Sequence, residues 1–129
     1  MPATGPGSFD STEAVAFADQ LALTRDLATL DAALMDAKAG GRLSLGTAAQ
    51  ALVAAEVVAA ARGSASPSLP AGLASWVSDG VAVTDMHRDV ALDALMAVRS
   101  DDSEMCEVAA ATWPTWSASL DDLRGRLLT

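Results

Sequence analysis

Apolar residues recur at helical spacing along most of the chain. The clearest example is near the C-terminus, where Trp116, Leu120, Leu123 and Leu127 follow one another at intervals of four, three and four residues. Residues at this spacing share one face of a helix. No alternation of apolar and polar residues persists over the length of a strand, as a half-buried strand would require. The pattern therefore predicts an all-α fold.

Breaks in this pattern divide the chain into six or seven helices. They are predicted at about residues 12–23, 25–39, 46–62, 71–78, 85–99, 102–111 and 114–128. The segment 46–62 is almost entirely apolar and rich in alanine, which is the best helix former and allows close helix approach. We therefore expect a compact bundle built around this central helix, with Gly63 as its C-terminal stop.

The length of 129 residues suits one domain. We find no internal repeat and no composition shift that indicates a second one. The expectation is a single helical domain over residues 1–129, with an entry loop at 1–10 and a surface linker at 63–70.

One acid, Glu56, lies within the central helix. At 100° per residue, Thr47, Gln50 and Arg62 share one arc of that helix, and Glu56 falls directly opposite them. The polar arc is predicted to face solvent, and Glu56 is predicted to point into the core.

A carboxylate on a core face must be paired or hydrogen-bonded, because burying it unpaired is costly. Three roles for Glu56 are open. It accepts hydrogen bonds from backbone N–H groups of the entry loop, it pairs with a buried arginine, or it is a catalytic general acid or base. The candidate arginines are Arg25, Arg88, Arg124 and Arg126.

The chain is acidic, with a formal net charge of −9 from 17 acidic and 8 basic residues. Binding to nucleic acid or to an anionic membrane requires clustered Lys and Arg, so the composition argues against both. The acidity permits a cationic protein partner, and it also keeps a small protein soluble. Asp85, Asp89 and Asp93 recur every four residues and form one stripe on the helix 85–99. This stripe is the candidate partner face, and its alternatives are a weak divalent-cation site or a solvated face.

The sequence shows no recognised catalytic or metal-binding motif. His87 is the only histidine and has no neighbouring ligand. Cys106 is the only cysteine, and the acids beside it disfavour the thiolate that reactivity needs. The glycine-rich start lacks the lysine and the preceding strand of a phosphate loop. We therefore name no catalytic residue, no metal ligand and no cofactor.

The N-terminus lacks the basic and apolar regions of a signal peptide. No apolar stretch reaches the roughly 18–20 residues that a membrane span needs. We therefore expect a cytoplasmic protein, and the oligomeric state is open.

The opening segment "GPGSFDSTEAVAF", residues 5–17, resembles the start of a bacterial family, domain of unknown function 4259. That family begins with Trp-Gly-x-Gly-x-Phe, followed by Asn-Asp and an alanine. Gly5, Gly7, Phe9 and Ala14 match, whereas Thr4 stands in place of the tryptophan and Ser11-Thr12 in place of Asn-Asp. "AAEVVAAARG" at 54–63 and "DLRGRL" at 122–127 are also similar, so the resemblance covers nearly the whole chain.

The resemblance implies a small helical bacterial protein without an assigned activity. Because the glycine-rich loop and the central acid recur together in the family, it also favours the first of the three roles, in which Glu56 anchors the entry loop. The entry-loop residues concerned are Gly5, Gly7, Phe9 and Asp10.

The function we expect is a non-enzymatic protein-binding module, for example an immunity- or antitoxin-like protein that neutralises a cationic toxin. The alternative is an enzyme, either a hydrolase centred on Glu56 or a carboxylate–metal site that uses Asp85 and Asp89. A third class is a structural subunit whose oligomer buries Trp113 and Trp116.

Overall fold

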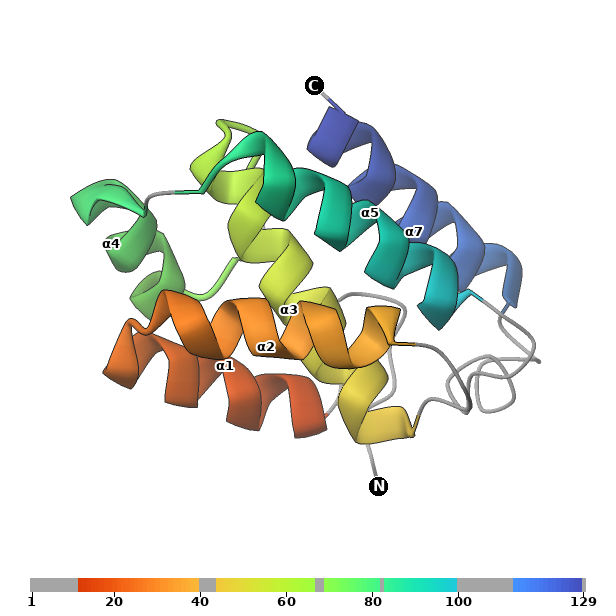
Figure 1. Ribbon diagram of the computed structural model, residues 1–129, viewed down its shortest axis with the longest axis horizontal. Coiled ribbons are helices and arrows are strands. Elements are labelled where there is room, and N and C mark those ends of the chain that lie inside the picture. Colours follow the sequence, from red (N-terminus) through yellow and green to blue (C-terminus); the bar gives the residue numbers. More distant parts are fainter. Residues whose placement is uncertain (1–11, 40–43, 67–68, 82, 100–112, 129) are drawn as a thin grey trace.

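The fold is an all-α bundle, shown by a computed structural model that describes residues 12–39, 44–66, 69–81, 83–99 and 113–128 (Figure 1). The described residues form six helices and no strand, which confirms the predicted fold class. The helices are α1 (Thr12–Thr24), α2 (Leu27–Lys38), α3 (Leu45–Ala61), α4 (Ala71–Gly80), α5 (Asp85–Val98) and α7 (Trp113–Leu128). The predicted short helix at 102–111 and the entry loop lie outside the described residues. None of the described helices is both long and apolar enough to cross a bilayer.

Helix α3 runs through the middle of the bundle and packs against α1, α2, α4, α5 and α7 (Figure 1). Every residue from 51 to 60 is buried. The prediction that the arc around Thr47 faces solvent is therefore wrong for the middle of this helix. Ala54 and Val58 lie on that arc and are fully buried. Neighbouring helices cover α3 on all sides, and only residues near its N-terminal end, such as Gln50, are exposed.

The short connection between α1 and α2 consists of Arg25 and Asp26. Arg25 has a positive φ of 48°, the left-handed conformation that commonly ends a helix. Asp26 then caps α2, because its side chain accepts a hydrogen bond from the backbone N–H of Ala28. This pair of helices, joined by two residues, is called the α1–α2 hairpin below, and each helix packs mainly on α3 rather than on the other.

The predicted inner stripe of the last helix is confirmed: Trp116, Leu120, Leu123 and Leu127 are all buried. This stripe places α7 against both α3 and α5. Because Trp116 is part of the core of one chain, it is not available as an anchor for an oligomer. The Trp113 side chain lies outside what the structure describes.

Two glycines at the opposite ends of α3 are expected to respond in opposite ways to substitution by alanine. Gly63 follows the helix with a φ of 99°, so Gly63→Ala should lower the free energy of unfolding by about 1–2 kcal/mol. Gly46 lies in the first turn, and a Cβ there would meet nothing within 4 Å. Gly46→Ala should therefore raise that free energy, by up to about 1 kcal/mol. Urea denaturation followed by circular dichroism measures both, and changes of the same sign would contradict this assignment.

Candidate functional site

The carboxylate of Glu56 lies inside the bundle and is bound by the guanidinium of Arg126. Glu56 is 3% exposed. The Nη1 of Arg126 donates to Oε1 at 2.6 Å, and its Nη2 donates to Oε2 at 3.1 Å. Two parallel N–H···O bonds are the strong, geometrically specific form of an arginine–carboxylate pair. Of the four arginines left open by the sequence, the structure brings Arg126 to Glu56.

The same guanidinium also holds two neighbouring segments. Its Nε donates to Oδ2 of Asp122, one turn earlier in α7, at 2.9 Å. Its Nη1 also donates to the backbone carbonyl of Ser64, in the segment that follows α3, at 3.4 Å. The predicted surface linker is therefore tied to α7 at Ser64. One arginine thus joins the middle of α3, the start of the linker and the last turns of α7.

Burial and charge act on Arg126 in opposite directions. The hydrogen bond with Glu56 raises the pKa of the Arg126 guanidinium above its ordinary value, and desolvation lowers it, with a net rise. The guanidinium therefore remains charged at every pH at which the protein would be handled. The Arg126 side chain is 17% exposed, so water reaches only a small part of it.

The other three candidate arginines lie elsewhere. Arg25 pairs with Asp79 of α4, and Arg88 pairs with Asp89 on its own helix. Arg124 is exposed and has no ion pair among the described residues. The entry-loop residues Gly5, Gly7, Phe9 and Asp10 lie outside the described residues, so contact between that loop and Glu56 stays a prediction.

Each acid of the predicted α5 stripe has a base of this chain beside it. The pairs are Asp85 with Arg62 at 2.9 Å and with Arg88 at 3.8 Å, Asp89 with Arg88 at 3.1 Å, and Asp93 with Lys38 at 3.4 Å. Two of these bases come from other helices or their ends, so the stripe links α5 to α2 and to the C-terminal end of α3. Much of its negative charge is therefore offset within the fold.

The sequence of this chain matches a family model described as "Domain of unknown function (DUF4259)" over residues 3–119. The chain belongs to this family. The DUF4259 match includes Glu56 but ends before Asp122 and Arg126, so it covers the buried acid and not its arginine. Comparisons with curated proteins and with solved structures gave no match. Membership of the DUF4259 family assigns no activity, and function has to be argued from the geometry of the chain.

His87 of this DUF4259 chain helps to cap helix α5. The backbone N–H of Thr84 donates to Nδ1 of His87 at 3.1 Å, in the first turn of α5. Thr84 is the N-cap of that helix, so the pair forms a capping box. Among the described residues, no group of three or more His, Cys, Asp or Glu side chains could hold a metal ion. Cys106 lies outside the described residues.

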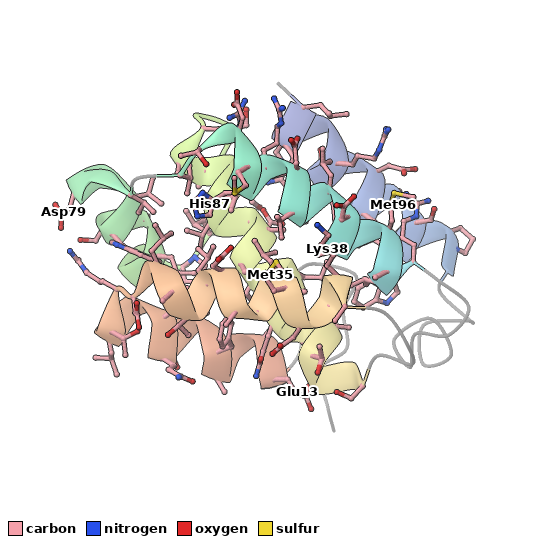
Figure 2. All side chains as sticks on the ribbon, in the orientation of Figure 1. Glu13, Met35, Lys38, Asp79, His87 and Met96 are labelled. Carbon is pink, nitrogen blue, oxygen red and sulfur yellow. The ribbon has the colours of Figure 1, made fainter. Side chains whose placement is uncertain are left out.

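A second group of acids lies on the α1–α2 hairpin and was not singled out by the sequence. Within the described part of the chain, the side chains of four hairpin acids take part in no ion pair and no hydrogen bond. These acids are Glu13, Asp19, Asp31 and Asp36. The two bases of the hairpin are directed to other helices, Arg25 to Asp79 of α4 and Lys38 to Asp93 of α5. Figure 2 shows Glu13 projecting from the start of α1 and Asp79 from the end of α4. The hairpin therefore presents uncompensated negative charge.

The same two helices also carry exposed apolar side chains. Val15 and Leu23 on α1 and Met35 on α2 are all exposed, and Figure 2 shows Met35 at the edge of α2 that also carries Lys38. Apolar side chains surrounded by charged ones are the usual composition of a protein-binding surface. The only sequence signal for this surface is the shortage of bases on these two helices.

Proposed function

We propose that this protein is a non-enzymatic binding module that recognises a cationic protein partner through the exposed side chains of the α1–α2 hairpin. The observation that carries the proposal is the set of four hairpin acids that have no partner among the described residues, in a fold where the α5 acids are paired. Acids that are already paired must exchange an internal ion pair for an external one. Acids without a pair give up only hydration, so they are the more favourable contact surface for a cationic partner.

The exposed apolar side chains of the hairpin support the same surface. Met35 offers a flexible, polarizable contact that adapts to a partner, and Val15 and Leu23 add apolar area. Charge would steer the encounter and apolar contact would slow dissociation. An immunity- or antitoxin-like protein that neutralises a cationic toxin is the concrete form of this proposal, motivated by the small size and the net charge of −9.

The geometry of Glu56 favours binding over catalysis. A general acid or base must reach the proton that it transfers. Both carboxylate oxygens of Glu56 accept hydrogen bonds from Arg126, and the residue is almost fully buried. We therefore assign Glu56 a structural role, as the acid that holds α7 and the linker on α3.

Two variants with equal changes in charge test the proposed surface. The first is Asp19→Asn, Asp31→Asn and Asp36→Asn on the hairpin. The second is Asp85→Asn, Asp89→Asn and Asp93→Asn on α5. A partner captured by the native chain should be retained by the α5 variant and released by the hairpin variant. Its binding should weaken as salt is raised, since exposed charge pairs are screened.

Circular dichroism of both variants controls for unfolding, and a binding isotherm gives the loss in affinity. Each exposed charge should contribute about 0.2–1 kcal/mol, so the hairpin variant, which loses three charges, should bind its partner about 3- to 150-fold more weakly. Equal losses in the two variants, or binding that persists unchanged at high salt, would contradict the proposal.

A further inference from the structure

A hollow lies between α5 and α7, on a part of the surface that the proposed partner face does not use. Its volume is about 340 Å³, near the lower end of the range for small-molecule sites. Its lining residues are Leu92, Leu95, Met96, Arg99, Leu120 and Arg124. Leu95 and Leu120 are buried and belong to the hydrophobic core, so they can form its apolar floor. Met96 is 70% exposed, and Figure 2 shows it where α5 and α7 run side by side.

The two arginines of the hollow differ in their partners. Arg99 is held by Asp121 and by the hydroxyl of Ser117, both on α7. Arg124 makes no ion pair or hydrogen bond within the described part of the chain. Of the eight bases of the chain, Arg42 lies outside the described residues. The six others besides Arg124 all have an acidic partner: Arg25, Lys38, Arg62, Arg88, Arg99 and Arg126. An unpaired guanidinium beside an apolar hollow is therefore exceptional among the described bases.

We propose that this hollow binds a small aliphatic monocarboxylate. The aliphatic tail would lie against Leu92, Leu95 and Leu120, where it leaves water for an apolar surface. The carboxylate would accept hydrogen bonds from Arg124, whose planar guanidinium matches a carboxylate with two parallel bonds.

The charge of the protein limits the ligand to a single negative charge. One guanidinium at the hollow has no partner in the described part of the chain, whereas the chain as a whole carries a net charge of −9. A polyanion would be repelled by the rest of the surface. A neutral aliphatic molecule would offer no negative charge to the Arg124 guanidinium. A monoanion with an apolar tail is the class that uses both the leucines and the arginine.

Titration of the whole chain with octanoate tests the proposal. Methyl NMR signals of Leu92, Leu95, Met96 and Leu120 should shift together and saturate, with a dissociation constant on the order of 0.1–1 mM. Octanol, which has a similar tail and no charge, should bind about tenfold more weakly or worse.

Three variants locate the carboxylate. Arg124→Gln should weaken octanoate binding by about tenfold or more, because it removes the charged donor. Arg25→Gln changes the net charge equally but lies at the α1–α2 connection, and should alter the affinity by less than about twofold. Met96→Glu should also weaken binding, because it adds a negative charge at the rim without disturbing the core.

Each contrary result overturns the proposal. Absence of saturable shifts would mean that another segment, a second copy or only water occupies the hollow. If the native chain and Arg124→Gln bind octanoate with equal affinity, or if octanoate and octanol bind equally well, then the carboxylate does not bind Arg124. Saturable shifts confined to other residues would place the ligand elsewhere.

Discussion

Replacing Arg126 with methionine is expected to lower the free energy of unfolding by about 3–5 kcal/mol, the usual cost of breaking a buried ion pair by removing one partner. The substitution leaves the Glu56 carboxylate buried, at 3% exposure, without the guanidinium that donates to both of its oxygens. Methionine keeps much of the aliphatic volume of arginine, so the loss reports on charge and hydrogen bonding more than on a cavity. Urea denaturation followed by circular dichroism at neutral pH measures it.

The exposed half of the same network provides the control. Asp122 is 69% exposed, and Asp122→Asn should cost less than about 1 kcal/mol. Glu56→Gln should cost about 1–3 kcal/mol, because Arg126 then faces a neutral amide with one acceptor oxygen instead of a carboxylate with two. The double variant Glu56→Gln, Arg126→Met should be less destabilised than the sum of the two single variants. A loss in Arg126→Met no larger than in Asp122→Asn would show that the buried pair does not hold α7 on α3.

The contribution of Arg126 to the pH dependence of stability has a defined sign. The hydrogen bond with Glu56 raises the pKa of Arg126 above its ordinary value. A raised basic pKa contributes stability that is fully present below the unfolded-state pKa and is lost as the pH rises through the folded-state pKa. Because both values lie far above neutrality, the coupling energy of the double-variant cycle should not fall between about pH 7 and pH 9. A fall over that interval would contradict the arginine assignment.

The helices were predictable from sequence because local chemistry marks their ends. Gly63 ends α3 in a left-handed conformation, and Thr84 caps α5. The inner face of α7 could be predicted equally well, since large apolar residues at helical spacing indicate one buried face. These signals are contained within single helices, so a single sequence is sufficient to read them.

The environment of the central helix was not predictable in the same way. Ala54 and Val58 lie on the arc that carries Thr47, and three polar residues near the helix ends led to the expectation of a solvent-facing side. Alanine gives little indication of which neighbours cover it, because its small side chain is tolerated on exposed and buried faces alike. Coverage of α3 on all sides depends on five other helices, and that arrangement is a property of the tertiary structure.

The sequence alone could not identify the partner of Glu56, although it did predict that a partner was needed. The cost of burying a carboxylate predicts a partner of some kind. Selecting Arg126 requires knowing that α7 packs on α3, across a separation of 70 residues. Likewise, the regular spacing of the α5 acids made them the visible candidates for a partner face. Their pairing with Arg62 and Lys38 became apparent only in the folded chain.

Replacing Trp116 with alanine is expected to lower the free energy of unfolding by about 3–5 kcal/mol, the usual cost of truncating a large buried aromatic residue. Trp116 is 4% exposed within the core of one chain. The loss should therefore be the same at two protein concentrations about 100-fold apart, since only an interface between subunits couples stability to concentration. Thr115→Ala, at the exposed neighbouring position, should change stability by no more than about 0.5 kcal/mol. A urea midpoint that rises with concentration in the native chain and loses this dependence in Trp116→Ala would instead make Trp116 a subunit contact.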